Sequence, residues 1–336
     1  TVAKLEDDLE HCRAALGLTG GFSNNWVISG SRTKSGKPIV ANDPHLPPTL
    51  PGHFYLSHIK SPEWNAVGAG IPGTPVIAAG HNGHVAWGVT SGLMDQADLF
   101  FEEIGTDGQS VRQGDEFVPC TVREERIEVK GGDTVVERVI ETPRGPVIGP
   151  AVAGAPASLS LRATWTLPQP FKGTPHAVRE KTFDSFFAQF EPQPMIGTNT
   201  VLADSEGTIG WWLTGRAPVR KRGNGMLPQP GWDESFGWTD ENVSLAQMPH
   251  VKNPESGFIG TANNKPRIDS SEYPYLGSEW LDGFRVNRIY SLLSERSDWD
   301  LSSVNDMQLD TVSTQWLEMR EGLTNVPRDL PGARRA

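Results

Sequence analysis

The shortness of its apolar runs is the feature that most constrains how this chain can fold. From Trp26 to about Ile104, runs of a few apolar residues alternate with Gly, Pro and Asn, and this spacing predicts closely connected strands. Strands return over residues 199–220, with a turn at residues 205–207. Because helical patterns occur only at intervals between these runs, the sequence favours an α+β fold over a doubly wound parallel sheet.

Two hairpins stand out in the strand-rich part. Asn82 and Gly83 suit a two-residue turn that requires positive φ, with His81 and His84 on either side as structural residues. Residues 123–148 predict two further strands joined near Gly131, in a β-rich insertion that covers about residues 105–170.

Three segments carry a helical pattern. Residues 1–18 predict a short helix that ends at glycines, and residues 176–190 predict an amphipathic helix. A last helix is expected to begin at Ser302 or Ser303. The apolar residues assigned to the faces of the second and third helices are Phe183, Phe186, Phe187 and Phe190, and Val304, Met307, Val312, Trp316 and Met319.

Composition narrows the class of protein. A net charge of −11 disfavours nucleic acid and anionic membranes as main partners. No apolar run approaches the roughly 18 residues of a membrane span, and the first residues lack the pattern of a signal peptide, so the compartment stays open. Cys12 and Cys120 are interpreted as isolated thiols. The chain starts without Met and stops soon after a helical pattern, so we expect it to be a piece of a longer polypeptide.

Ser23 is the unusual residue, in GGFSNNWVISG at residues 20–30. The chain lacks a G-x-S-x-G elbow, an H-E-x-x-H motif and a P-loop, and a serine among glycines and asparagines is most often a turn residue. A serine needs a base, however, and its own α-amine would serve if the chain were cut before it. A free α-amine has a pKa of about 7.7–8.0, so much of it is neutral near physiological pH.

Five motifs, in order, resemble the penicillin acylase (penicillin amidase) family of N-terminal-nucleophile hydrolases. They are FSNNWVISGSRTKSGKPIVANDPHL, GIPGTPVIAAGHNGHVAWGVTSGLMDQADLF, GTIGWWLTGRAPVR, SGFIGTANNKP and DGFRVNRI. The resemblance implies part of an αββα sandwich and a precursor that cleaves itself before Ser23. Residues 1–22 would then end the α-subunit or spacer, and residues 23–336 would begin the β-subunit. The α-subunit of the same precursor is the implied partner, and family members are often exported.

The resemblance also assigns catalytic roles. Ser23 matches the nucleophile, and the backbone N–H of Ser91 and the side-chain amide of Asn263 match the two oxyanion donors. Arg285 matches an arginine that orients the site. From the residues alone, Asn263 is better explained as a turn residue beside Asn264, and Arg285 is equally a surface or salt-bridging arginine.

His45 matches a position that is histidine in cephalosporin and acyl-homoserine-lactone acylases and glutamine in the best-known penicillin G acylases. A histidine there is expected to tune or relay the proton of the amine, since its unperturbed pKa is about 6.5. The alternative is a structural histidine next to Pro44.

A structural calcium is implied by Asp95, Asp98 and the backbone carbonyl of Ala97. Calcium takes 6–8 oxygen ligands, and two aspartates do not fill that shell. The ligand from the α-subunit lies outside this sequence, and SSEYPYLGSEW departs from the family pattern for a later aspartate. A surface acidic pair is the alternative.

These residues predict a hydrolase of linear, non-peptide amides that acts on a small acylated amine, such as the side-chain amide of a β-lactam. Two alternatives stay open: an acyl-homoserine-lactone acylase, and a non-catalytic β-rich protein that binds ligands. The joint presence of Ser23, Asn263 and Arg285 argues against the last. As long as the nitrogen of Ser23 remains in a peptide bond, the chain is expected to be inactive.

Overall fold

The structure is a computed structural model, and it describes residues 22–149, 154, 157–168, 172–191, 194, 196–266 and 274–324. The helix predicted over residues 1–18 and Cys12 lie outside the described residues. None of the helices described is long and apolar enough to cross a membrane. Cys120 is half-buried, and this burial raises the pKa of its thiol.

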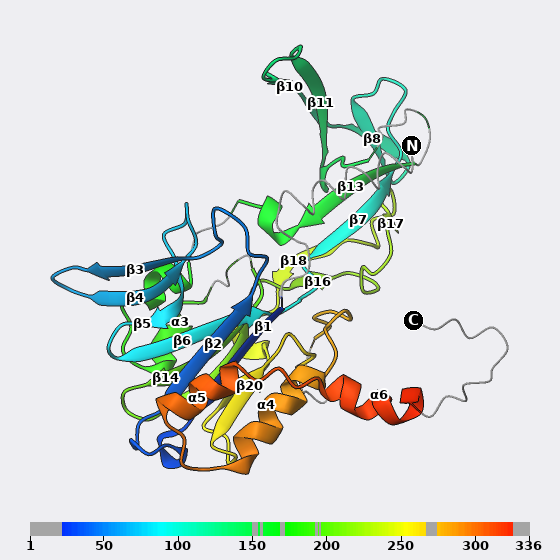
Figure 1. Ribbon diagram of the computed structural model, residues 1–336. Coiled ribbons are helices and arrows are strands. Elements are labelled where there is room, and N and C mark those ends of the chain that lie inside the picture. Colours follow the sequence, from blue (N-terminus) through cyan, green and yellow to red (C-terminus); the bar gives the residue numbers. More distant parts are fainter. Residues whose placement is uncertain are drawn as a thin grey trace.

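Two antiparallel sheets face each other at the centre of the molecule (Figure 1). The larger has seven strands, in the order β19 (His250–Lys252), β15 (Ile209–Thr214), β14 (Thr198–Asp204), β6 (Val85–Ser91), β5 (Ile77–His81), β4 (Asn65–Gly70) and β3 (Tyr55–Lys60). The smaller has three, in the order β2 (Ile39–His45), β1 (Phe22–Ile28) and β20 (Phe258–Thr261). Strand β1 packs on β6 and β14 of the larger sheet.

Helices cover the outer faces of both sheets (Figure 1). Helix α3 (Phe183–Ala188), preceded by α2 (Thr174–Ala177), packs on β14 and β15. On the other side α4 (Phe284–Glu295) packs on β20 and β1, and α5 (Leu301–Gln308) packs on β2, while α6 (Thr314–Thr324) contacts α4. The four layers are those of an α+β sandwich, as the sequence predicts.

The remaining strands form smaller sheets beyond one end of the sandwich (Figure 1). They are β7 (Ala97–Glu102), β8 (Ser110–Gln113), β9 (Glu116–Pro119), β10 (Thr121–Ile127), β11 (Val135–Thr142), β12 (Gly145–Pro146), β13 (Ser158–Ala163), β16 (Pro218–Arg220), β17 (Gln229–Pro230) and β18 (Trp238–Asn242). Strands β10 and β11 pair in antiparallel register, with Gly131 at a φ of 79° in their connection. This pair is the predicted second hairpin.

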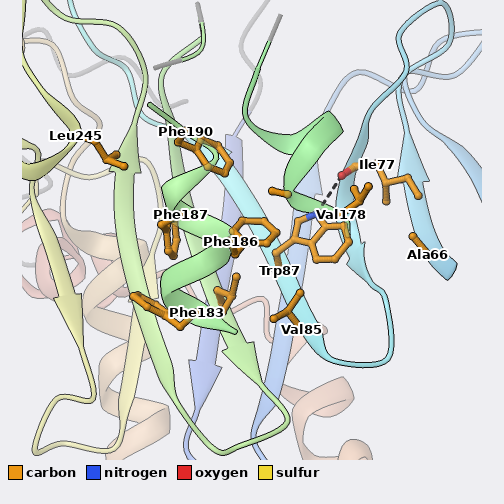
Figure 2. Close-up of a cluster of buried hydrophobic side chains, with 12 residues drawn as sticks. Ala66, Ile77, Val85, Trp87, Val178, Phe183, Phe186, Phe187, Phe190 and Leu245 are labelled. Carbon is orange, nitrogen blue, oxygen red and sulfur yellow. Dashed lines mark hydrogen bonds between the residues drawn. The ribbon is translucent and has the colours of Figure 1, made fainter. Parts of the chain in front are cut away.

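The predicted helix over residues 176–190 is correct in its buried face and wrong in its length. Thr182 caps α3, because its hydroxyl accepts from the N–H of Ser185, and the preceding residues form the separate short helix α2. The phenylalanines of α3 fill a core against Trp87 of β6, whose indole Nε1 donates to the carbonyl of Ile77 at 3.0 Å (Figure 2). Burying each such ring contributes roughly 1.5–3 kcal/mol.

The connection between β5 and β6 differs from the expected two-residue turn. It has three residues, 82–84, and Gly83 takes a φ of 88°. The side-chain oxygen Oδ1 of Asn82 accepts from the N–H groups of His84 and Val85, and its Nδ2 donates to the carbonyls of Val178 and Glu180. Asn82 therefore fixes the loop and ties it to the segment that leads into α3.

The single helix expected near the C-terminal end is two helices. Asp300, not Ser302 or Ser303, caps α5, and Ser303 completes a reciprocal capping box with it. The helix ends before Asp310, whose carboxylate pairs with Arg288 and accepts from the N–H of Val312. Val304 and Met307 are buried as predicted, whereas Val312 after α5 and Trp316 and Met319 on α6 are exposed.

Candidate active site

Ser23 is the second residue of β1, the central strand of the smaller sheet, and it is buried at 9 % exposure. Its backbone N–H donates to the side-chain oxygen Oδ1 of Asn263 at 2.7 Å. Its neighbour on β2 is Pro44, which has no N–H to donate. Pairing with β20 begins only at Asn25. The backbone N–H and carbonyl of Ser23 therefore bond to side chains, of Asn263 and Arg285, where a complete strand ladder would supply backbone partners.

Asn263 lies just after β20, is 1 % exposed and has a φ of 60°. Asn tolerates this left-handed conformation better than most residues, so the turn interpretation is correct for the backbone. Its side chain also belongs to the site: Oδ1 accepts from Ser23, and Nδ2 donates to the carbonyl of Ser91 at 3.0 Å. The amide thereby connects the start of β1 to the end of β6.

Arg285, in the first turn of α4, points its guanidinium at the backbone of Ser23 and at the side chain of Asn263. Its Nη1 donates to the carbonyl of Ser23 at 3.0 Å and to Oδ1 of Asn24 at 2.8 Å. Its Nη2 donates to the carbonyl of Ala262 at 2.6 Å and to Oδ1 of Asn263 at 3.2 Å. Burial lowers the pKa of this guanidinium and nearby Asp282 opposes the shift, so a desolvated cation lies beside the backbone of Ser23.

Ser91 ends β6 opposite Thr198 of β14. Its carbonyl accepts from Nδ2 of Asn263 and from Nδ2 of Asn199 at 3.2 Å, whereas its side chain is exposed. The structure therefore brings the backbone of Ser91 to Asn263, as expected for two groups of one site. The hydrogen bond between them uses the carbonyl of Ser91 and not its N–H.

A buried polar network supports these residues from between the two sheets. The amide nitrogen of Asn25 donates to the carbonyls of Gly88 and Asn199, and its oxygen accepts from the hydroxyl of Thr261. The hydroxyl of Thr90 lies 2.9 Å from that of Thr261 and accepts from Asn199. Sequence reasoning missed this network, although asparagines inside apolar strands were a signal for it.

His45 ends β2, and the strand register places it opposite Phe22 instead of Ser23. Its Nε2 lies 2.8 Å from a carboxylate oxygen of Asp43. Phe22, Asp43, His45 and Arg285 line a common cavity of about 420 Å³. In this cavity the ring of Phe22 stacks on the guanidinium of Arg285, with 5.1 Å between the guanidinium carbon and the ring centroid.

His81 and His84 lie at the opposite end of β6 from Ser91, in keeping with a structural interpretation.

The residues assigned to calcium do not fit that ion. Arg220 donates from Nε and Nη2 to both oxygens of Asp98 at 2.8–3.1 Å, and its Nη2 lies 3.1 Å from Oδ1 of Asp95. Ala97, the third assigned residue, is in the β7–β13 ladder opposite Ala163. Within the described residues, no three His, Cys, Asp or Glu side chains are grouped so that they could hold a metal ion.

Two facing sheets between helical layers, with Ser23 on a central strand, define the fold of an N-terminal-nucleophile hydrolase. The solved structure of thermostable penicillin G acylase from Alcaligenes faecalis has this fold. It superposes with a TM-score of 0.74 at 20 % identity, over 93 % of this chain and 57 % of that one. A family model described as penicillin amidase matches residues 3–335, and the chain belongs to the penicillin amidase family.

Curated relatives carry two kinds of name. Acyl-homoserine lactone acylase QuiP of Pseudomonas aeruginosa is 34 % identical over 95 % of this chain and 39 % of its own length. Penicillin acylase 2 proenzyme of Pseudomonas sp. is 33 % identical, over 89 % of this chain and 39 % of its own length. Penicillin G acylase of Escherichia coli is 29 % identical, over 84 % and 34 %. The chain thus spans about two fifths of the curated relatives that it matches.

Proposed function

We propose that this chain begins the catalytic subunit of an amide hydrolase whose nucleophile is Ser23 after the Phe22–Ser23 bond has been cut. One observation carries the proposal: the nitrogen that cleavage would free is already held at 2.7 Å by Asn263. A new α-amine at this position would be oriented by the same oxygen. The cation of Arg285 nearby would favour the neutral form of that amine, which is the form that accepts a proton.

Self-cleavage follows from the same atoms. The hydroxyl of Ser23 attacks the carbonyl of Phe22, and the amide becomes an ester on the serine oxygen. Water then hydrolyses the ester, which releases the carboxylate of Phe22 and leaves Ser23 with a free amine. Asn263 and Arg285 hold the backbone on the serine side of this bond, so its nitrogen keeps its place as the bond breaks.

The hydrolysis of substrate repeats this chemistry in two halves. The hydroxyl of Ser23 attacks the acyl carbonyl while its amine takes the proton, and an oxyanion forms. The amide of Asn263 and the N–H of Ser91 are the proposed donors. Nδ2 of Asn263 carries two N–H groups, one of which donates to the Ser91 carbonyl, and the other is the proposed donor to the oxyanion. The proton then passes to the departing amine, and water releases the acid from the acyl-serine by the same route.

The substrate class that we propose is a small acylated amine. Relatives are named both as penicillin acylases and as acyl-homoserine lactone acylases, so the two candidates are the side-chain amide of a β-lactam and an N-acyl-homoserine lactone. The partner that we propose is an α-subunit cut from the same precursor; one relative is named a proenzyme. We also propose that His45, which lies opposite Phe22 and lines the same cavity, tunes or relays the proton of the Ser23 amine.

Intact-mass analysis of the complete polypeptide tests this proposal. We expect a new N-terminus at Ser23, a Ser23→Ala variant that stays uncut, and a Ser31→Ala control that is processed normally. A serine-reactive sulfonyl fluoride should attach to Ser23 of the processed protein and raise its mass by that of one label. The mechanism would be overturned by a wild type that is active although uncut, or by a Ser23→Ala variant that is still processed. A processed protein that shows neither labelling nor turnover would favour a non-catalytic binding protein. Relative rates on phenylacetyl and long-chain acyl amides then separate the two substrates.

A further inference from the structure

Arg220 occupies the centre of a buried charged cluster beyond the end of β6. Its side chain is 4 % exposed, and that of Asp98 is fully buried. Nε and Nη2 of Arg220 both face the carboxylate of Asp98, and Nη2 also contacts Oδ1 of Asp95. Planar two-nitrogen contacts of this kind are the strongest geometry for an arginine–carboxylate pair.

Two aromatic side chains of the cluster provide further hydrogen-bond partners for the carboxylates of Asp98 and Asp95. The indole Nε1 of Trp238 donates to Oδ2 of Asp98 at 2.8 Å, and the hydroxyl of Tyr275 lies 3.4 Å from Oδ2 of Asp95. The ring of Tyr275 faces the guanidinium carbon of Arg220 at 5.6 Å. A side-chain carbon added at Gly225 would lie 2.1 Å from Oδ1 of Asp98, so the chain closes tightly over the cluster.

We propose that Arg220 is the resident cation of this cluster and stands where the family resemblance implies calcium. Calcium needs 6–8 oxygen ligands at about 2.3–2.6 Å, whereas here N–H donors occupy the lone pairs of Asp98. A second cation on the same oxygens would be repelled by the adjacent guanidinium. The pair of aspartates is therefore neutralised by the chain itself, and the fold does not depend on calcium.

This internal cation anchors the segment that leaves the candidate site. After Ser91, the N–H of Gly92 donates to the carbonyl of Gly197, and the carbonyl of Gly92 accepts from the indole of Trp280. The N–H of Asp95 then donates to the carbonyl of Leu276, and the side chain of Asp95 meets Arg220. The segment of residues 92–95 is thus held at both ends, at Gly92 after β6 and at Asp95 in the Arg220 cluster.

Metal content and thermal unfolding of the complete polypeptide test the proposal, independently of the catalytic function. We expect the dialysed wild type to hold far less than one equivalent of calcium, and its Tm to be unchanged by EDTA or by added calcium chloride. Arg220→Met should lower the Tm by about 5–10 °C, because it leaves buried charges unpaired. Added calcium should raise the Tm of this variant and not that of the control Arg123→Met, which breaks two exposed ion pairs.

Arg220→Lys keeps the charge but loses the two-nitrogen geometry, and its Tm should fall between those of the wild type and Arg220→Met. Stoichiometric calcium in the wild type, or a Tm lowered by EDTA, would overturn the proposal. So would an Arg220→Met variant as stable as the wild type in EDTA. If Arg220→Met does not fold, the calcium content and chelator response of the wild type and of Arg220→Lys decide the question.

Discussion

The side-chain oxygen of Asn263 accepts a hydrogen bond of 2.7 Å from the backbone nitrogen of Ser23, 240 residues earlier in the chain. The other end of the same amide donates to Ser91 at the end of β6. One side chain thus sets the distance between the proposed nucleophile and the strand that supplies the second proposed oxyanion donor. The consequences of this arrangement can be measured.

Replacing Asn263 by Ala should reduce kcat/KM by roughly 10²–10³, since an oxyanion donor and the support of the amine are lost together. Asn264→Ala is the matched control, because the side chain of Asn264 accepts from the N–H of Ala262 and donates to the carbonyl of Lys265, both backbone groups. Steady-state kinetics on the processed enzyme provide the measurement. Equal losses in both variants would show that the effect comes from the turn and not from the amide of Asn263.

Arg285→Met should reduce kcat/KM by roughly 10- to 100-fold, because its guanidinium donates charged hydrogen bonds around Ser23. It should also shift the pH profile. A nearby cation lowers the pKa of the amine, so removing it raises that pKa, and the acidic limb of kcat/KM moves to higher pH. Arg296→Met, which loses an exposed pair with Asp298, is the control. An unshifted limb would mean that Arg285 acts only by positioning.

Phe22→Gly should slow self-cleavage by about 2- to 30-fold, the equivalent of a cation–π contact of about 0.5–2 kcal/mol. The ring of Phe22 lies over Arg285 and so holds the residue on the departing side of the bond. Phe22→Tyr keeps that contact and should be processed at the wild-type rate. Since residue 22 leaves with the departing segment, the processed enzymes should have identical kcat/KM values, and a difference between them would contradict this role.

Asp300 should make the stability of the fold depend on pH in the acidic range. Lys34 and the groups of Ser303 lower its pKa, so the folded state prefers the ionised carboxylate. Its contribution is therefore complete above the unfolded pKa near 4 and is lost as the pH falls through the lowered folded pKa. Asp300→Asn keeps a capping side chain without the charge, and it should flatten the decrease in Tm on acidification. If the Tm of Asp300→Asn falls as steeply with pH as that of the wild type, groups other than Asp300 cause the acid sensitivity.

Phe186→Ala should lower the free energy of unfolding by about 3–5 kcal/mol, because the ring is fully buried in the α3 core. Phe117→Ala removes a half-exposed ring on β9 and should cost much less. Urea or thermal denaturation followed by circular dichroism measures both. Similar losses would mean that the α3 core does not dominate the stability of this part of the fold.

The apolar pattern predicted the α+β class, the β10–β11 hairpin and the buried face of α3, because these depend on residues close together in sequence. The pattern gave wrong limits where side chains capped the backbone, as with Thr182 and Asp300. The site was predictable only through the family motifs. Ser23, Ser91, Asn263 and Arg285 are far apart in sequence, and strand pairing together with the packing of α4 on β20 and β1 brings them together.

Two parts of the site were beyond local reasoning. The network of Asn25, Thr90, Asn199 and Thr261 forms between strands that no sequence period relates. Arg220 lies in a quoted motif, GTIGWWLTGRAPVR, yet its pairing with Asp95 and Asp98 depends on contacts across more than 120 residues. Charge neutralisation of this kind is decided by the tertiary fold.

Pro44 opposite Ser23 has a further consequence. From Asn24 to Ile28, β1 keeps its partners on β2, and from Asn25 it also pairs with β20. A break before Ser23 removes only the pairing of Phe22 with His45 from this sheet. The new chain end would therefore stay fixed by the remaining pairing of β1 with β2 and β20 when the preceding segment departs.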